Sequence, residues 1–416
     1  MKSYGSGSIL VVCNISLPRP GAPWRRIEYF ASFLSARGMR VDVIGALQPS
    51  RQLKNIFKYT KGITYGNFRI FNIQWQIYIL NWMVGIFNLI GTFPILIISL
   101  VKRPRIILVS LPHIEPLLLT YITAKLLKSK LIVDLRDPLE YWPRWTKGFT
   151  RIFYSFLVTL SYVLIRKSDL TLAVTPSLMG TLAKRGVRAH LVVNGADTQV
   201  FRPYYNYEIK EIKKKLGLSN DEAVLVFNGY VGKYYDITPL LYAIAKLPIE
   251  LKRKIRLLLV GGFWDPVYAR KFLDTARKLH LQSSIKVLKP IQDACTLAKI
   301  LSVANVGVIT RTASELYDPT IPAKFYEYLA CGLPILALAR CGSELWRLIT
   351  EWRVGFVCEP NDYDCIVNAL EKLLDQNFVE NIRANVLRVR PLIDRSRAAE
   401  KLFMLLSEMI ENKRES

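Results

Sequence analysis

The feature that most constrains the fold is a regular alternation, along the whole chain, of short apolar runs with longer amphipathic stretches. Apolar runs without polar alternation are typical of strands buried on both faces of a parallel sheet, and the stretches between them are typical of covering helices. A first series of runs comprises Ile9–Cys13, Val41–Ile44, Arg69–Ile73, Ile106–Ser110, Leu131–Leu135, Leu170–Val174 and Leu191–Val193. A second series comprises Val224–Asn228, Arg256–Val260, Ile285–Leu288, Val306–Ile309, Ile335–Ala337 and Gly355–Val357. The pattern predicts an α/β protein with parallel sheets.

Two such series in one chain of 416 residues predict two doubly wound, Rossmann-like domains. The segment 194–203, which begins with Asn-Gly and ends with Pro, has the turn residues that separate the two series. We expect an N-terminal domain over residues 1–198, a C-terminal domain over 199–394, and a helix over 395–416 that returns to the N-terminal domain. Ligands of open α/β sheets bind at the carboxyl ends of the strands, so the residues that follow the strands are candidates for a site in a cleft between the domains.

Basic residues are concentrated in the N-terminal half. The net charge is +25, and residues 1–205 hold 27 Lys and Arg against 8 Asp and Glu, which leaves only +6 for the rest of the chain. Such a surface attracts the phosphates of anionic lipids, of nucleic acids or of a charged substrate, although a generally basic proteome gives the same excess. The chain lacks the interleaved aromatic and basic residues of a nucleic-acid-binding module, so we expect no nucleic acid partner.

The six cysteines form no Cys-x-x-Cys pair and have no neighbouring histidine. This spacing argues against a zinc site and against a disulfide framework, and it favours a reducing compartment. The apolar run 8–13 has no cleavage site and is interpreted as a strand rather than as a signal peptide. We therefore expect a cytoplasmic protein without a bound metal.

The segment from Ile70 to Val101 contains no charged residue and is long enough to cross a membrane. Its polar side chains are spaced so that they fall on one stripe of a helix, and they are Asn81, Asn88, Thr92 and Ser99. A spanning helix would separate the two flanking strands of one sheet. We therefore expect a helix over residues 76–101, kinked at Pro94, that lies in a membrane interface beside basic clusters, with a second apolar helix over 152–165 on the same surface. A wholly buried helix and a spanning helix are the alternatives.

The most informative motif is Pro319-Thr-Ile-Pro-Ala-Lys-Phe-Tyr-Glu-Tyr-Leu-Ala-Cys-Gly-Leu-Pro-Ile-Leu336. Pro322 suits the first turn of a helix, Gly332 suits its end, and the helix follows a predicted strand. Free backbone amides at such a helix start bind anions, and Lys324 adds positive charge. Glu327 lies where its carboxylate can accept two ribose hydroxyl groups.

A second motif, Phe227-Asn-Gly-Tyr-Val-Gly-Lys233, also follows a predicted strand. Gly229 and Gly232 permit a tight turn whose backbone amides face a phosphate, and Lys233 can pair with a diphosphate. The stretch Val260-Gly-Gly262 forms a glycine loop after the next strand.

These motifs resemble those of the retaining GT-B glycosyltransferases of family four, in the branch that makes cell-envelope and lipid-linked glycans. The resemblance covers nearly the whole chain and implies a GT-B fold of two Rossmann-like domains. It also implies that the C-terminal domain binds a nucleotide sugar through Gly229, Gly232, Lys233, Gly261, Lys324, Phe325 and Glu327.

On the N-terminal side, Val133-Asp-Leu-Arg-Asp137 followed by Tyr141-Trp-Pro143 resembles a D-x-R-D-x-W-P motif of the same branch. The resemblance implies that Asp137 positions or deprotonates the acceptor hydroxyl group and that Arg136 contacts sugar or phosphate; a pair that only holds the loop is the alternative. Gly21 and Arg25, in a stretch that resembles the family's first loop, and His113, after the strand at 106–110, are further acceptor-side candidates. A structural role is the alternative for His113.

The resemblance implies a retaining hexosyltransferase that works at the cytoplasmic face of a membrane. The donor is a nucleotide diphosphate sugar, with UDP as the default and GDP as an alternative, and the acceptor is a lipid-linked or cell-envelope glycan. The nucleotide sugar is a co-substrate, and we expect neither a cofactor nor a metal. Relatives often have a first glutamate where this chain has Pro319, and Asp318 or Glu315 can replace it. A nucleotide-sugar 2-epimerase and a non-catalytic, membrane-docking pseudo-transferase are the alternatives.

Overall fold

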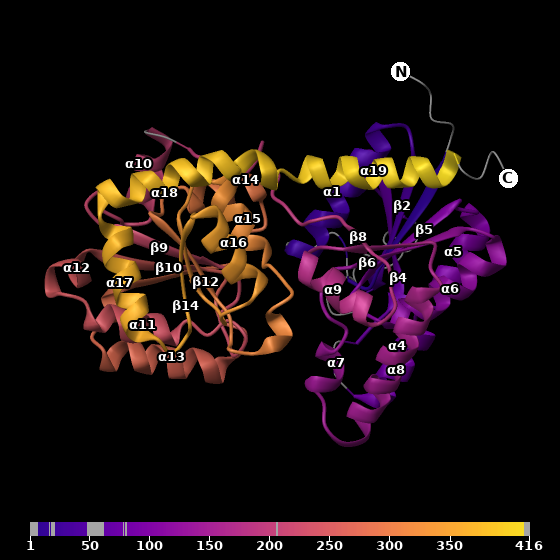
Figure 1. Ribbon diagram of the computed structural model, residues 1–416, viewed down its shortest axis with the longest axis horizontal. Helices are drawn as coiled ribbons and strands as arrows, with labels where there is room; N and C mark the ends of the chain where they lie inside the picture. Colours follow the sequence, from indigo (N-terminus) through magenta and orange to yellow (C-terminus); the bar gives the residue numbers. More distant parts are fainter. Residues whose placement is uncertain are drawn as a thin grey trace. The chain divides into compact units, whose positions relative to one another are not determined.

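The computed structural model describes residues 7–15, 17, 21–47, 62–77, 79, 81–204 and 207–411 (Figure 1). The chain divides into two compact units, of which unit 1 comprises Met1–Val193 and Ala398–Ser416, and unit 2 comprises Asn194–Arg397. The division falls at Val193 rather than at the expected residue 198, and the chain returns to unit 1 at Ala398 rather than at 395. Each unit has its own sheet and its own core.

Unit 1 contains one eight-stranded sheet in the order β3-β4-β2-β1-β5-β6-β7-β8. Its strands are β1 (Ser8–Cys13), β2 (Arg40–Leu47), β3 (Ile63–Tyr65), β4 (Phe68–Trp75), β5 (Ile106–Leu111), β6 (Lys130–Leu135), β7 (Leu170–Ala173) and β8 (His190–Leu191). Among the described strands, β3 and β4 pair antiparallel and the other neighbours pair in parallel. The predicted strands of the first series are confirmed, and β3 is an addition that is too short to give an apolar run.

Both faces of this sheet are covered by helices. The helices of unit 1 are α1 (Ala22–Ala36), α4 (Trp82–Ile90), α5 (Pro94–Lys102), α6 (Glu115–Leu127), α7 (Tyr141–Arg144), α8 (Gly148–Arg166), α9 (Pro176–Lys184) and most of α19 (Arg395–Glu411). Along β1, Ile9 and Val11 belong to a cluster with α1 and α19, whereas Leu10 and Val12 belong to a cluster with α6 and α8. This alternation is the doubly wound arrangement that continuous apolar strands require.

The expected helix over residues 76–101 is instead two helices, α4 and α5, separated by a turn at 91–93. α4 begins at Trp82 because Asn81 caps it, its side chain accepting a hydrogen bond from the Met83 amide at 2.9 Å. Pro94 lies in the first turn of α5, where its missing N–H removes no helical hydrogen bond. The proline therefore starts a new helix and does not kink a continuous one.

Unit 2 contains a six-stranded, fully parallel sheet in the order β11-β10-β9-β12-β13-β14. Its strands are β9 (Ala223–Asn228), β10 (Ile255–Val260), β11 (Ile285–Leu288), β12 (Val306–Thr310), β13 (Ile335–Leu338) and β14 (Gly355–Cys358). Its helices are α10 (Tyr207–Lys215), α11 (Thr238–Lys246), α12 (Ile249–Lys254), α13 (Pro266–Lys278), α14 (Ala294–Leu301), α15 (Ala323–Ala330), α16 (Glu344–Trp352), α17 (Tyr363–Leu374) and α18 (Gln376–Val389). Short 3-10 helices η2 (Gln282–Ser284), η3 (Glu315–Tyr317) and η4 (Arg390–Ile393) complete it. The two-sheet α/β architecture that was expected is confirmed.

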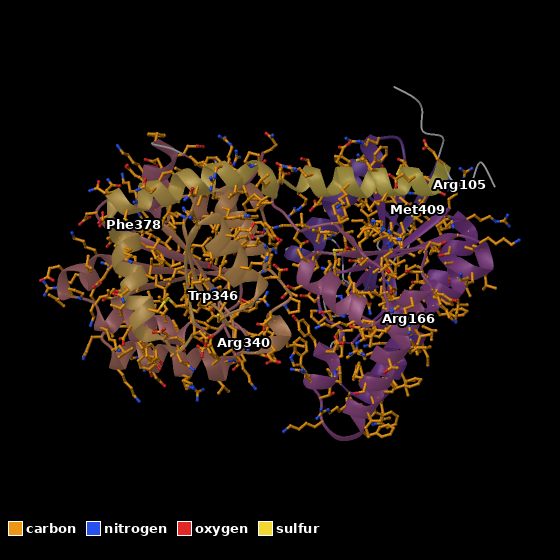
Figure 2. All side chains as sticks on the ribbon, in the orientation of Figure 1. Arg105, Arg166, Arg340, Trp346, Phe378 and Met409 are labelled. Atoms are coloured by element: carbon orange, nitrogen blue, oxygen red, sulfur yellow. A yellow bond between two sulfur atoms is a disulfide. The ribbon has the colours of Figure 1, made fainter. Side chains whose placement is uncertain are left out.

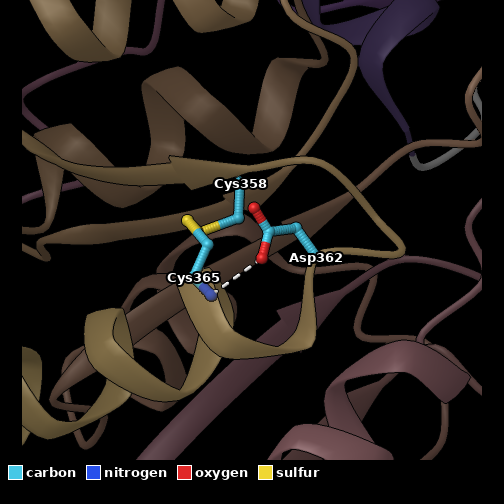
Figure 3. The surroundings of a disulfide bond; sticks show 3 residues. All are labelled: Cys358, Asp362 and Cys365. Carbon is cyan, nitrogen blue, oxygen red and sulfur yellow. Dashed lines mark hydrogen bonds between the residues drawn. A yellow bond between two sulfur atoms is a disulfide. The ribbon is translucent and has the colours of Figure 1, made fainter.

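A disulfide bond joins Cys358, at the end of β14, to Cys365, in the first turn of α17 (Figure 3). Asp362 caps α17 by accepting a hydrogen bond from the Cys365 amide at 3.0 Å, and this tight connection brings the two Cα atoms to 5.9 Å. The expectation that the cysteines form no disulfide is therefore wrong for this pair, so the cysteines no longer argue for a reducing compartment. The spacing of seven residues belongs to no recognisable motif, and only the turn reveals the pairing.

Candidate functional site

The sheet of unit 2 changes direction between β9 and β12. From β9 the chain builds β10 and β11 on one side, and it then returns to build β12, β13 and β14 on the other. The carboxyl ends of β9 and β12 therefore flank a topological switch point, which is where open α/β sheets bind ligands. Asn228 and Gly229 stand at the end of β9, and Thr310 and Arg311 stand at the end of β12.

The loop after β9 lies directly against the glycine loop after β10. A Cβ atom on Gly261 would come within 2.4 Å of the Gly229 carbonyl oxygen, and Gly261 has a φ of +136°, so only glycine fits there. The Gly229 amide donates to the Val260 carbonyl at 2.7 Å, and the Gly232 amide donates to the Tyr235 carbonyl at 3.4 Å. The two glycines thus set the shape of the loop through their own amides, and the expectation that the backbone amides of this turn face a phosphate stays a prediction.

Helix α15 starts beside this loop, and the side chain of its N-cap residue makes no capping hydrogen bond. Pro322 is its N-cap residue, one position earlier than the first turn where it was expected, and the helix proper begins at Ala323. The first amides of a helix have no carbonyl partner one turn earlier, so this uncapped start is a place for an anion.

Lys324, in the first turn of α15, is buried. Its Nζ atom lies 3.6 Å from the centre of the Phe227 ring and 4.6 Å from that of Tyr235, an aromatic cage under the loop after β9. Burial holds the pKa of Lys324 well below its usual value, the neighbouring charge of Arg311 lowers it further, and Glu327 acts in the opposite direction. The side chain is thus a basic group held out of water at the switch point.

Glu327, one turn further along α15, is 3% exposed. Its Oε2 atom accepts a hydrogen bond from the Asn228 side-chain amide at 2.9 Å, and the Asn228 backbone amide donates to the Tyr328 hydroxyl at 2.6 Å. These bonds tie α15 to the end of β9. Phe325, expected to contact the ligand, is instead fully buried in the core against Trp352, because it lies on the opposite face of the helix. Lys233 is exposed on the loop.

A small pocket lies at the carboxyl ends of β12 and β13. Its lining residues are Arg311, Thr312, Ser314, Tyr317, Asp318, Thr320, Ala339, Arg340, Ser343 and Leu345. Arg340, labelled in Figure 2, binds the Asp318 carboxylate through Nε at 2.9 Å and Nη2 at 2.6 Å. Glu315 lies 3.7 Å from Arg340 on the surface, so of the two acids considered as replacements at Pro319, Asp318 is the one in the pocket.

In unit 1, Arg136 is buried and donates through Nε to the Leu111 carbonyl at 3.0 Å. Burial lowers its pKa, and the nearby carboxylates of Asp134 and Asp137 counteract this effect. Asp134 also forms a buried ion pair with Arg26, with 2.9 Å between Asp134 Oδ1 and Arg26 Nη2. The arrangement makes Arg136 part of the sheet edge, while Asp137 is only half-buried beside it.

His113 follows β5 at the same edge. Its Nδ1 atom lies 3.5 Å from the Gln76 side-chain amide, and its ring lies 5.3 Å from that of Trp142, whose indole N–H donates to the Pro112 carbonyl at 2.7 Å. Gly21, with a φ of +127°, and Arg25, half-buried on α1, follow β1, the strand next to β5. The acceptor-side candidates thus share the carboxyl edge of one sheet.

Several residues at these sites were not expected from the sequence. Asn228 is the partner of Glu327, Arg311 lies beside Lys324, and Arg340 holds Asp318 in the pocket. A charged residue directly after an apolar strand was the available signal for Arg311. Arg340 lies beyond β13 and gave no signal of its own.

Residues 208–387, within unit 2, match the family described as glycosyl transferases group 1. The chain is 26% identical over 222 residues to N-acetyl-alpha-D-glucosaminyl L-malate synthase of Bacillus anthracis. The aligned region covers 52% of this chain and 54% of that protein. The chain is also 26% identical over 192 residues to the probable glycosyltransferase WbjE of Pseudomonas aeruginosa, covering 42% and 46%. The matched part thus spans about half the length of these relatives.

Solved structures share the fold over nearly the whole chain. Sucrose-phosphate synthase of Thermosynechococcus elongatus superposes with a TM-score of 0.75 at 16% identity, covering 97% of this chain and 100% of that one. HepE of Anabaena, solved with UDP-glucose, superposes with a TM-score of 0.73 at 16% identity, covering 96% and 99%. At these identities the likeness is one of fold.

Proposed function

Unit 2 belongs to the glycosyl transferases group 1, and from this premise we propose that the protein is a retaining glycosyltransferase that uses a nucleotide diphosphate sugar. The observation that carries the proposal is the start of α15, where uncapped amides, the buried Lys324 and the carboxylate of Glu327 meet at the switch point of the sheet. The diphosphate sits on the amides and Lys324, and Glu327 accepts the ribose hydroxyl groups. Lys233 adds a charge from the exposed loop.

UDP is the default nucleotide, with GDP as the alternative. Support for UDP comes from HepE, a neighbour in fold that was solved with UDP-glucose. Because Asn228 already donates to Glu327, binding of the ribose requires the carboxylate to accept hydroxyl donors through its remaining lone pairs.

In the proposed reaction, negative charge builds on the β-phosphate as the sugar leaves. The helix start and Lys324 stabilise this charge, so we propose that no metal and no cofactor is required. The acceptor hydroxyl attacks from the face of the leaving group and gives its proton to the β-phosphate, which retains the configuration at the sugar carbon. Asp137 positions the acceptor, and Arg136 holds the edge of β6 on which Asp137 stands.

We further propose that unit 1 contacts a membrane, because α4 and α5 bury their polar side chains and expose their apolar ones. The polar stripe faces the protein, with Asn88, Thr92 and Ser99 buried, while Asn81 caps the helix. The outward side chains are apolar, and Met83, Phe87, Ile90, Phe93, Ile97 and Val101 are all exposed. An exposed apolar face over a buried polar stripe suits lipid better than water.

Helix α8 extends the same surface. In Figure 1, α4, α7 and α8 project from the sheet of unit 1, and Trp82 of α4 meets Phe149 of α8 with ring centres 5.2 Å apart. A Cβ atom on Gly85 would come within 2.5 Å of the Phe153 ring, so glycine lets the two helices approach closely. By length and composition both Trp82–Lys102 and Gly148–Arg166 could cross a membrane. Because they also carry buried residues that pack on the sheet, we propose a peripheral contact on the cytoplasmic face, whose anionic lipids attract the basic unit.

Donor turnover tests the enzymatic proposal. The purified protein should release UDP from a UDP-sugar, slowly to water and faster in the presence of a lipid-linked glycan extract, and Glu327→Ala should lose most of this rate. Full activity of Glu327→Ala would contradict the assigned donor site, and the absence of turnover with bound nucleotide would favour the pseudo-transferase.

Vesicle flotation tests the membrane contact. Phe87→Asp should weaken binding to vesicles that contain phosphatidylglycerol by at least ~10-fold, since it removes an aromatic group from the exposed apolar face and adds a negative charge there. Val267→Asp, at a 79% exposed apolar position on α13 of unit 2, is the matched control and should leave binding unchanged. Equal binding by both variants would refute the assigned surface.

A further inference from the structure

Arg311 is a buried cation at the switch point that the proposed donor site does not yet use. It directly follows β12, the neighbour of β9, and it lines the small pocket at the ends of β12 and β13. It lies close enough to Lys324 for its charge to lower the pKa of that ammonium group. The pocket and the loop after β9 are contiguous, since Tyr234 of the loop meets Tyr317 of the pocket wall with ring centres 6.2 Å apart.

Among the described residues, the buried guanidinium group of Arg311 has no counter-ion. Arg311 is 9% exposed, and its Nη1 atom donates to the Thr320 hydroxyl at 2.9 Å. Its Nε atom is buried without a hydrogen-bond partner, and its Cζ atom lies 5.3 Å from the centre of the Tyr317 ring. Across the part of the chain that the structure describes, no carboxylate lies within ion-pair distance of this group.

Two other arginines of the protein, Arg26 and Arg340, have a carboxylate as partner of the guanidinium group. Arg26, which is 3% exposed in unit 1, donates through Nε and Nη2 to the two oxygens of Asp134 at 3.1 and 2.9 Å. Arg340, across the same pocket, is paired with Asp318. A buried charge without a partner costs several kcal/mol by its lost hydration, so it persists where a ligand supplies the partner.

Lys324 is a second buried basic group at the same site. Its ammonium group meets aromatic faces, and among the described residues it has neither an ion pair nor a hydrogen bond. Arg311 and Lys324 are thus two buried basic groups, and the charge of Arg311 acts on the pKa of Lys324, while the Glu327 carboxylate that acts in the opposite direction already accepts a hydrogen bond from Asn228. The site has a surplus of positive charge that a doubly charged anion would neutralise.

We infer that Arg311 is a binding residue for the diphosphate of the donor, with its free guanidinium edge and Lys324 gripping one phosphate group between them. The inference rests on the proposed function, because it takes the anion to be that of a nucleotide sugar. The guanidinium fork gives two directed bonds to phosphate oxygens, which an ammonium group cannot match. The sugar next to that phosphate then lies at the mouth of the pocket, which Asp318, Thr312 and Ser314 line.

Calorimetric titration of the full-length protein with UDP, GDP and the corresponding monophosphates tests this inference. The wild type should bind one of the diphosphates more tightly than its monophosphate. Arg311→Met should weaken binding of that diphosphate by ~10- to 100-fold and change binding of the monophosphate by less than about 2-fold. Arg311→Lys, which keeps the charge and the fold but loses the fork, should lie between these values. Arg277→Met, which removes an exposed arginine on α13, is the control and should bind as the wild type does.

The outcomes separate the inference from its premise. If the wild type binds neither diphosphate, the proposed function falls and the inference falls with it. If the wild type binds the diphosphate and both Arg311 variants keep that affinity, only the inference is overturned. Equal weakening of diphosphate and monophosphate binding by Arg311→Lys would also overturn it, because it would mark a structural role.

Discussion

Replacing Lys324 with methionine should make the ligand-free protein more stable and at the same time abolish its stabilisation by nucleoside diphosphate. Methionine has nearly the length of lysine, and its thioether suits the faces of Phe227 and Tyr235 that surround the Nζ atom at 3.6 and 4.6 Å. The change removes a buried charge and leaves no cavity. The two effects have opposite signs, so a general weakening of the fold cannot imitate them.

The size of the gain follows from burial. An unpaired polar group inside a protein costs about 1–3 kcal/mol by mutational data, and the neighbouring charge of Arg311 adds to the cost at this position. The Lys324→Met variant should therefore be about 1–3 kcal/mol more stable at neutral pH. For a unit of roughly 200 residues this corresponds to a rise in Tm of about 2–4 °C per kcal/mol.

The pH dependence of stability tests independently whether Lys324 destabilises the folded protein. Because the folded-state pKa of Lys324 lies below the unfolded value of about 10.5, the unfolded chain binds more protons between these two pKa values. The stability of the wild type should therefore rise with pH through that window, by at most about 1.4 kcal/mol per pH unit, and the advantage of Lys324→Met should shrink as pH approaches 10.5. Differential scanning calorimetry over this range measures it.

Lys372→Met is the matched control, since Lys372 lies 5.7 Å from the Phe356 ring but is exposed to water. Its free energy of unfolding should change by no more than about 0.5 kcal/mol, with a correspondingly small change in Tm. With UDP at 100 times its Kd, the wild type and the control should gain about 2.7 kcal/mol, and Lys324→Met should gain almost nothing. A destabilised Lys324→Met variant, or one that UDP stabilises as it does the wild type, would refute the reasoning.

Three further predictions concern the rest of the chain. Gly261→Ala should cost more than about 2 kcal/mol in chemical unfolding, because its Cβ atom would meet the Gly229 carbonyl oxygen at 2.4 Å, whereas Gly262→Ala, with open space around it, should cost about 1 kcal/mol; equal costs would contradict the packing of the two loops. Cys365→Ser should lower the free energy of unfolding by about 2.5 kcal/mol through loss of the loop closed by Cys358, while Cys295→Ser, at an exposed free cysteine, should be neutral; an unchanged Cys365→Ser variant would show that the disulfide does not form. Glu115 is fully buried, and burial raises its pKa, so the wild type should lose stability relative to Glu115→Gln as pH rises from about 4.5 through the raised pKa; parallel urea-unfolding curves for the two proteins at all pH values would contradict this.

Much of the fold could be predicted because buried parallel strands leave continuous apolar runs. The strand that the sequence does not reveal, β3, is three residues long, and its place in the sheet depends on its antiparallel pairing with β4. The break between α4 and α5 depends on the capping of α4 by Asn81 and on the turn before Pro94, and both are local choices that hydropathy does not resolve.

The inward polar stripe of α4 and α5 was foreseeable from spacing alone, and the structure places three of its four members inside. The donor site was foreseeable only in part. Helix periodicity locates Lys324 and Glu327 one turn apart, but Phe325, between them in sequence, faces the core. Arg311 and Asn228 join the site because β9 and β12 are neighbours in the sheet, and sequence spacing alone does not reveal strand order.

The central claim is that a nucleoside diphosphate seats on the first turn of α15. A crystal structure of the protein soaked with UDP tests it most directly. We expect the β-phosphate within hydrogen-bond distance of the Ala323 and Lys324 amides, and the ribose hydroxyl groups on Glu327. Electron density for UDP away from α15, or a diphosphate that contacts neither the helix amides nor Lys324, would contradict the account.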